Sequence, residues 1–160
     1  MPVVSANGVQ LYYERRGGGP PLLLIMGASG CGGVFDRFAD FLARERTVVT
    51  YDRRGNGRSP RPPRWDTTSP QEQADDAAAL LDALGLTPAV VFGTSSGGIF
   101  PLAMLTLHPE AVRGAVRRPG AAGGLLPLPG GADRPGRGAG RGAGRSGALV
   151  HHGAACLWRN

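Results

Sequence analysis

Apolar runs alternate with amphipathic segments along the first 116 residues of this chain. Residues 21–25, 47–51 and 89–93 are rich in apolar and β-branched residues, as in strands that are buried on both faces of a sheet. The segments between them, 34–44 and 70–84, repeat apolar residues with the period of a helix. Strands separated by helices of this length predict right-handed crossovers, so we expect these strands to lie parallel in one sheet.

Local signals support both helices. The second helix has clear start signals: Ser69 can cap it, Pro70 suits its first position, and Glu72 completes a capping box. The first helix is expected to carry one apolar face, formed by Val34, Phe35, Phe38, Phe41 and Leu42.

The first 13 residues predict a different element. Asn7 and Gly8 separate two short apolar stretches, and both tolerate the positive φ angles of a tight hairpin turn. We therefore expect an antiparallel hairpin before the parallel strands. The predicted fold class is α/β, with a mostly parallel sheet and an N-terminal antiparallel hairpin.

The alternation of strands and helices ends after Val116. Residues 117–160 are rich in Gly, Arg, Ala and Pro, and residues 136–147 form a short repeat of the GRGA type. Such a composition lacks the apolar periodicity of a packed domain, and we expect this tail to be disordered. The chain is thus divided into an α/β unit, residues 1–116, and a Gly/Arg/Ala/Pro-rich tail.

The positive charge of the chain is concentrated in that tail. The formal net charge is +6, from 18 basic and 12 acidic residues. Residues 1–116 hold 11 of each, so the excess comes from 7 Arg against the single acid Asp133 in residues 117–160. Arginines can bind phosphates, but base stacking needs aromatic side chains and the tail offers only Trp158. Nucleic-acid binding is therefore the weaker alternative.

Nothing along the chain indicates a membrane or a metal. No run of about 18 apolar residues could span a bilayer, and the first ten residues lack the basic and apolar regions of a signal peptide. Cys31 and Cys156 match no metal-ligand spacing. The cytoplasm is the expected compartment.

The most specific chemical signal is GTSSG, residues 93–97. It follows an apolar strand and precedes an apolar helical segment, as in the Gly-x-Ser-x-Gly nucleophile elbow that displays a reactive serine. Ser95 would be the nucleophile, and the N–H of Ser96 would donate to an oxyanion, aided by the dipole of a helix that begins near Ser96. The alternative is a Gly/Ser-rich turn without a chemical role. Pro101 is expected to kink the following helix.

Two further segments are expected beside this serine. LLLIMGASG, residues 22–30, is a strand that ends in small residues, and the N–H of Ala28 is the second candidate oxyanion donor. A plain strand-to-helix loop is the alternative there. YDRRGNGRS, residues 51–59, forms a turn in which Asp52 and Arg54 are expected to brace the backbone rather than to take part in chemistry.

These segments resemble the N-terminal half of bacterial α/β-hydrolase-fold proteins. The resemblance covers residues 1–116 and rests on LLLIMGASG, TVVTYDRRGNGRS, EQADDAAALLDALG, VFGTSSGG and HPEAVRGAV, in that order. It implies a serine hydrolase that acts on an ester or similar small-molecule substrate and needs no metal or organic cofactor. Met26 departs from the pattern, because relatives commonly carry His or Pro before this glycine, and this leaves open what braces the oxyanion loop.

The resemblance also implies an acid and a histidine later in the chain. Asp133 and either His151 or His152 are the candidates, but the sequence around them shows no crossover helix or strand that would bring them to Ser95. The composition after residue 116 is typical of GC-rich DNA read in a shifted frame, so we expect a truncated or frameshifted C-terminal half. The chain is then either an impaired hydrolase or an inert fragment.

Overall fold

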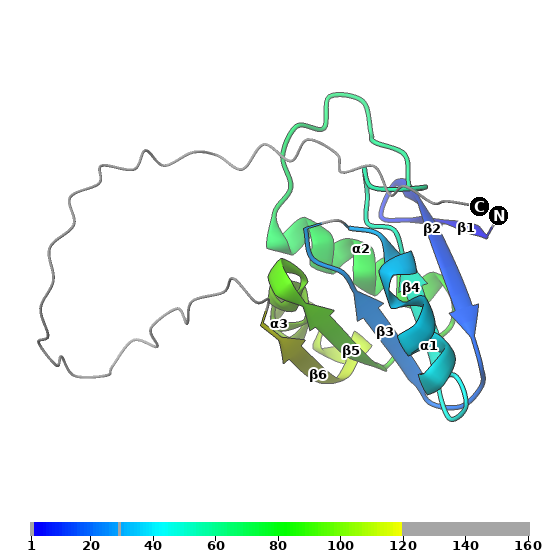
Figure 1. The fold of residues 1–160 in the computed structure, drawn as a ribbon. Coiled ribbons are helices and arrows are strands. Elements are labelled where there is room, and N and C mark those ends of the chain that lie inside the picture. Colours follow the sequence, from blue (N-terminus) through cyan, green and yellow to red (C-terminus); the bar gives the residue numbers. More distant parts are fainter. Residues whose placement is uncertain (1, 29, 120–160) are drawn as a thin grey trace, which may run out of the picture.

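A computed structural model describes residues 2–28 and 30–119, which form a six-stranded sheet in the order β1-β2-β4-β3-β5-β6 (Figure 1). The strands are β1 (Val3–Ala6), β2 (Val9–Arg16), β3 (Pro21–Ile25), β4 (Thr47–Tyr51), β5 (Ala89–Thr94) and β6 (Val112–Arg118). The pairs β1–β2 and β2–β4 are antiparallel, and the other three pairs are parallel. This confirms the predicted α/β fold class and its N-terminal antiparallel hairpin.

The winding of the sheet reverses around β3. The chain passes from β3 to β4 on one side and then returns to place β5 on the other side of β3. β3 and β5 pair in parallel from Leu22 opposite Val90 to Ile25 opposite Gly93. In an open parallel sheet, ligands usually bind outside the carboxyl ends of the strands at such a reversal.

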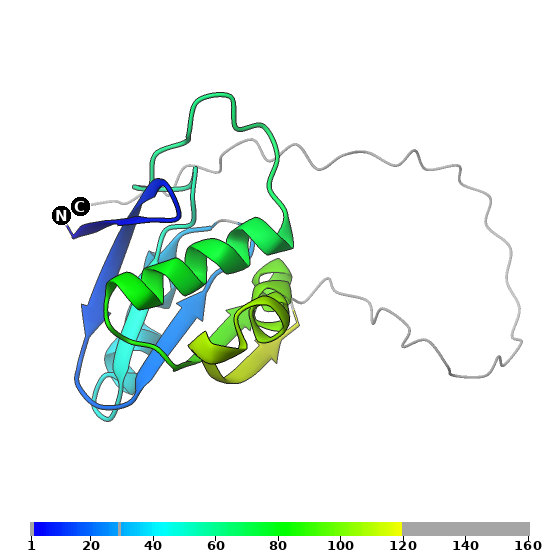
Figure 2. The ribbon, with the colours of Figure 1, turned by 180° about the vertical axis from the view of Figure 1, so that it is seen from behind.

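Helices cover both faces of the sheet. α1 (Asp36–Leu42) lies on the face seen in Figure 1, and α2 (Pro70–Ala83) and α3 (Phe100–Leu107) lie on the face seen in Figure 2. Successive strand residues face opposite sides, so the sheet supplies two apolar clusters. The strand residues buried under α2 and α3 include Leu23, Ile25, Val49 and Val91, and those under α1 are Leu24 and Val48.

The first helix differs from its prediction. Gly32–Phe35 form a 3₁₀ helix, η1, and only Asp36–Leu42 are α-helical. A 3₁₀ helix has about 3.0 residues per turn instead of 3.6, so the two segments do not follow one helical period. Three of the five apolar residues are 44–63% exposed: Val34, Phe38 and Phe41. The prediction of one helix over residues 34–44 was therefore wrong.

The second helix begins where its signals predict. The Ser69 hydroxyl accepts a hydrogen bond from the N–H of Glu72 at 3.1 Å, and Pro70 occupies the first turn. The Glu72 carboxylate is not turned back toward the cap. It accepts hydrogen bonds from the side chains of Arg54 and Trp65 instead, so the serine half of the predicted capping box is formed.

The last described strand, β6, lies at one end of the sheet order and extends two residues past the expected limit at 116. Several large apolar side chains around it are exposed: Ile99, Leu102, Leu105, Leu107 and Val116. The expectations for the tail, including Asp133, His151 and His152, lie outside the described residues. Among residues 2–28 and 30–119, no helix has the length and apolar character needed to cross a bilayer.

Tyr51, the last residue of β4, carries a polar atom that the fold leaves unsatisfied. The residue is 1% exposed, and its hydroxyl has no hydrogen-bond partner among the described residues. Because burial disfavours the charged phenolate, it raises the pKa of Tyr51 far above the ordinary tyrosine value of about 10.

We expect Tyr51→Phe to raise the free energy of unfolding by about 1 kcal/mol, since it removes a buried donor that lacks a partner. The folded-state pKa is raised, so the wild-type chain loses stability as the pH rises above about 10, and the variant should lose less. Denaturant titrations at about pH 7 and about pH 11 measure both effects. Tyr13→Phe, at the position opposite Tyr51 in the β2–β4 register, is the matched control. A less stable Tyr51→Phe variant at neutral pH would contradict this account.

Candidate active site

The loops that follow β3 and β5 are in contact where the sheet reverses its winding. Ser95 directly follows β5 and is partly exposed. Its φ angle is +56°, whereas Thr94 before it is still extended at φ −118°. The chain therefore turns sharply at Ser95, which begins a 3₁₀ helix, η2 (Ser95–Ile99). This is the strand-to-helix turn that a nucleophile elbow requires.

Three glycines allow the backbone to close around Ser95. A Cβ atom on Gly93 would lie 2.3 Å from the Gly97 carbonyl oxygen, and one on Gly97 would lie 2.8 Å from the Ile25 carbonyl oxygen. A Cβ atom on Gly27 would lie 2.9 Å from Cβ of Ser95. All three distances are shorter than Cβ atoms tolerate, so none of these positions has room for a side chain. The expected need for small residues at 93 and 97 is confirmed, and Gly27 shares it.

The α-helix after Ser95 starts later than predicted. α3 begins at Phe100, with Pro101 in its first turn. In a continuous helix from Ser96, Pro101 would lack the N–H that should reach Gly97, and its ring would clash there. The N–H of Phe100 bonds to the Gly97 carbonyl instead, as in a 3₁₀ turn. Pro101 therefore lies in the first turn of α3 instead of kinking it, and the helical segment expected near Ser96 begins as a 3₁₀ helix.

The two predicted oxyanion donors lie on different loops that contact each other. Ala28 lies in the turn after β3, Ser96 follows Ser95, and both residues are exposed. A Cβ atom on Gly27, next to Ala28, would lie 3.0 Å from the backbone nitrogen of Ser96. The loop that carries Ala28 is therefore in direct contact with the turn that carries Ser95 and Ser96.

Arg53 is a site-supporting residue that the sequence did not single out. It is 6% exposed, and its guanidinium donates to the Gly27 carbonyl at 2.7 Å and to the Met26 carbonyl at 3.1 Å. It also donates to Oε1 of Gln73 at 3.1 Å and lies 5.1 Å from the centre of the Phe100 ring. Burial lowers the pKa of Arg53. Arg53 thus braces the loop after β3, a role that the departure at Met26 had left open. The one sequence feature that could have indicated this role is Gln73, a polar residue on the buried side of α2.

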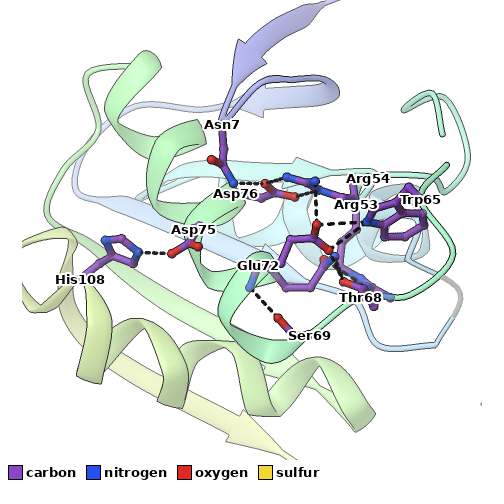
Figure 3. A network of polar contacts seen from close by, with 11 residues as sticks. Asn7, Arg53, Arg54, Trp65, Thr68, Ser69, Glu72, Asp75, Asp76 and His108 are labelled. Carbon is purple, nitrogen blue, oxygen red and sulfur yellow. Dashed lines mark hydrogen bonds and ion pairs between the residues drawn. The ribbon is translucent and has the colours of Figure 1, made fainter. Parts of the chain in front are cut away.

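Asp52 and Arg54 brace the loop after β4, as the sequence indicates. Asp52 is 1% exposed and accepts hydrogen bonds from the N–H groups of Gly32 at 2.8 Å and Arg58 at 2.9 Å. Arg54 donates from Nε to Oδ2 of Asp76 on α2 at 2.6 Å (Figure 3). This hydrogen bond raises the pKa of Arg54. Both residues hold backbone segments together and neither contacts Ser95 in any hydrogen bond of the described chain.

His108 is the only histidine in the described part of the chain. It directly follows the last residue of α3, whereas Ser95 begins η2, which comes before α3. Its Nε2 lies 2.7 Å from Oδ1 of Asp75 on α2 (Figure 3), and both residues line a groove of about 540 Å³. His108 and Ser95 thus lie at opposite ends of the segment formed by η2 and α3, and no hydrogen bond of the described residues joins them. Within residues 2–28 and 30–119, no group of three or more His, Cys, Asp or Glu could hold a metal ion.

A second groove, of about 520 Å³, adjoins the elbow on the side of α1. It is lined by Met26, Val34, Phe35, Phe38, Phe92, Thr94 and Arg118. Thr94 and Met26 immediately precede Ser95 and Gly27, so the groove begins at the elbow. Its aromatic and aliphatic walls suit an uncharged organic group.

The close packing at the elbow predicts a contrast between two glycines. Gly93→Ala should lower the free energy of unfolding by about 1–3 kcal/mol, because the new methyl group has no room beside Gly97. Gly114→Ala on the neighbouring strand β6 is the matched control, since a Cβ there would have no heavy atom within 4 Å. That control should be neutral or stabilising by about 0.5–1 kcal/mol. Denaturant unfolding measures both, and equal effects would refute the close contact.

Comparisons with known proteins agree with this fold. The family model described as the alpha/beta hydrolase fold matches residues 20–117. The uncharacterized hydrolase YraK of Bacillus subtilis is 41% identical over 109 residues, which cover 68% of this chain and 40% of that protein. The putative carbamate hydrolase RutD of Azorhizobium caulinodans is 39% identical over 115 residues, 71% of this chain and 42% of RutD.

The fold also superposes on solved hydrolases. The structure titled "Est816 as an N-Acyl homoserine lactone degrading enzyme" matches with a TM-score of 0.67 and 35% identity, over 72% of this chain and 44% of that one. The chain thus spans about two fifths of the length of the relatives it matches. Since the family model covers more than half of the chain, the chain belongs to the α/β-hydrolase family.

Proposed function

We propose that Ser95 is the nucleophile of a serine hydrolase site, with the N–H groups of Ala28 and Ser96 as its oxyanion donors. The observation that carries this proposal is the φ angle of +56° at Ser95. Such a conformation costs a residue with a side chain about 1–3 kcal/mol, and strain of this kind is concentrated at functional sites. Most positive-φ positions in the described chain are glycines. A turn without a chemical role would be more stable with glycine at position 95 as well.

The proposed reaction is acyl transfer to Ser95. The Ser95 Oγ atom attacks the carbonyl carbon of an ester, forming an Oγ–C bond, while the carbonyl oxygen becomes an oxyanion that accepts hydrogen bonds from Ala28 and Ser96. The serine proton passes to a base and then to the leaving alkoxide as the ester C–O bond breaks. Water then hydrolyses the acyl-serine by the same steps, which restores the serine.

The substrate class is proposed to be a small ester, lactone or related carbonyl compound. The names of the similar proteins support it, since Est816 is described as degrading an N-acyl homoserine lactone and RutD as a putative carbamate hydrolase. The apolar groove beside Thr94 suits the uncharged part of such a molecule.

We further propose that the base limits this activity. A serine hydroxyl needs a histidine to take its proton, and loss of the triad histidine costs a serine protease on the order of a million-fold in turnover. The one histidine in the described part of the chain, His108, follows the C-terminal end of α3 and is hydrogen-bonded to Asp75 of α2. Asp133 and either His151 or His152 are the candidates that this sequence offers for the pair, and they lie outside that part. An inert fragment remains the alternative.

A fluorophosphonate probe tests the nucleophile and the base together. The probe labels an activated serine by forming an Oγ–P bond with loss of fluoride. We expect slow labelling that Ser95→Ala abolishes and that Ser5→Ala, a change at an exposed serine of β1, leaves unchanged. Mass spectrometry of the labelled peptide identifies the serine.

Different outcomes would contradict different parts of this proposal. Equal labelling of the wild-type chain and Ser95→Ala would remove Ser95 as the nucleophile. Fast, stoichiometric labelling of Ser95 that is lost in a His151→Ala/His152→Ala double variant would show that the tail supplies a base. Negligible labelling of every chain over hours would favour the inert fragment.

A further inference from the structure

Arg53 forms hydrogen bonds with both ends of the turn after β3. Its Nη2 donates to the Gly27 carbonyl at 2.7 Å and its Nε to the Met26 carbonyl at 3.1 Å. Its backbone N–H donates to the Gly30 carbonyl at 2.7 Å, and the Gly30 N–H donates to the Gly27 carbonyl at 2.9 Å. Four hydrogen bonds therefore hold the backbone of Met26, Gly27 and Gly30.

The bond to Gly27 has a consequence for Ala28. The Gly27 C=O and the Ala28 N–H belong to one peptide group, which is planar and trans, so the two point in opposite directions. A donor that holds the Gly27 oxygen therefore also fixes the direction of the Ala28 N–H, which points away from Arg53. A hydrogen bond from a cation to the oxygen also polarises the peptide group and makes its N–H a stronger donor.

We propose that Arg53 is a positioning residue of the hydrolase site, which aims the Ala28 N–H at the oxyanion formed on Ser95. The inference rests on the proposed function of Ser95 and Ala28. The close approach of Gly27 to the turn at Ser95 supports it. A Cβ atom on Gly27 would lie 2.9 Å from Cβ of Ser95 and 3.0 Å from the backbone nitrogen of Ser96.

The surroundings of Arg53 hold the guanidinium in one orientation. Gln73 is 0% exposed and accepts from Nη1 at 3.1 Å, and the Phe100 ring lies 5.1 Å from the guanidinium carbon. A side chain so enclosed has little freedom to release the carbonyls. Lysine could not replace it fully, because an ammonium lacks the planar fork that reaches two carbonyls and an amide at once.

Arg53→Met and Arg53→Lys test this role against Arg54→Lys as the matched control. Met keeps the aliphatic stem and removes every donor, Lys keeps the charge, and Arg54 belongs to the same loop but bonds to Asp76 and Glu72 on α2. We expect the rate constant for fluorophosphonate labelling of Ser95, per folded molecule, to fall about 10–100-fold in Arg53→Met. Arg53→Lys should fall less, and Arg54→Lys should match the wild type. Circular dichroism gives the folded fraction, and Arg53→Lys carries the test if Arg53→Met does not fold.

Nuclear magnetic resonance provides a readout that is independent of reactivity. The carbonyl-carbon shift of Gly27 and the amide-nitrogen shift of Ala28 report the hydrogen bond at their shared peptide group. Both should move in the Arg53 variants and stay unchanged in Arg54→Lys.

Unmoved shifts in the Arg53 variants would overturn the positioning role. So would a labelling rate per folded molecule that matches the wild type, or an equal loss in Arg54→Lys. If Ser95→Ala labels as the wild type does, the proposed function fails instead, and the shifts alone then decide whether Arg53 holds the peptide.

Discussion

The close contact between the carboxyl ends of β3 and β5 is the constraint that shapes the site. Neighbouring strands lie about 4.8 Å apart, and the loops that leave them here turn toward each other. Gly27, Gly93 and Gly97 fill that contact, and each lacks room for a side chain. The chain can then leave β5 only by turning within one residue, which places Ser95 in the left-handed region. The geometry of the turn at Ser95 is thus a consequence of backbone packing.

Three successive residues after β4 connect this contact to the rest of the molecule. Asp52 holds the start of η1 through Gly32, Arg53 holds the loop after β3, and Arg54 holds α2 through Asp76. Burying charged groups costs free energy unless their charge is paired or hydrogen-bonded. Asp52 and Arg54 form ion pairs, and Arg53 donates hydrogen bonds to two backbone carbonyls and to Gln73. Since each side chain reaches a different element, the loop fixes the relative positions of β3, η1 and α2. Apolar contacts alone would leave these positions less well defined, because dispersion has little directional preference.

The features that could be predicted from the sequence are those with local causes. Apolar runs predicted the strands, Ser69 predicted the start of α2, and the spacing of glycines predicted the turn at Ser95. The features that could not be predicted depend on tertiary contacts. Arg53 and Arg54 are identical and adjacent, and only the packed structure decides that the first points under the β3 loop and the second toward α2. The start of α3 is an intermediate case, because the position of Pro101 in the sequence was a sufficient reason for a late helix start.

In a serine hydrolase, the base has a different structural origin from the nucleophile and its oxyanion donors. In this chain the proposed nucleophile and both proposed oxyanion donors lie on loops after β3 and β5, which are neighbours at the point where the winding reverses. Their geometry is held by backbone contacts and by Arg53, all within residues 2–28 and 30–119. The base has a different task, because it must remove the proton of the Ser95 hydroxyl. None of the contacts that shape the elbow accepts this proton. An oxyanion site can therefore be rigid and correctly aimed while the serine is slow to react, since donor geometry and proton transfer lower the barrier by separate interactions.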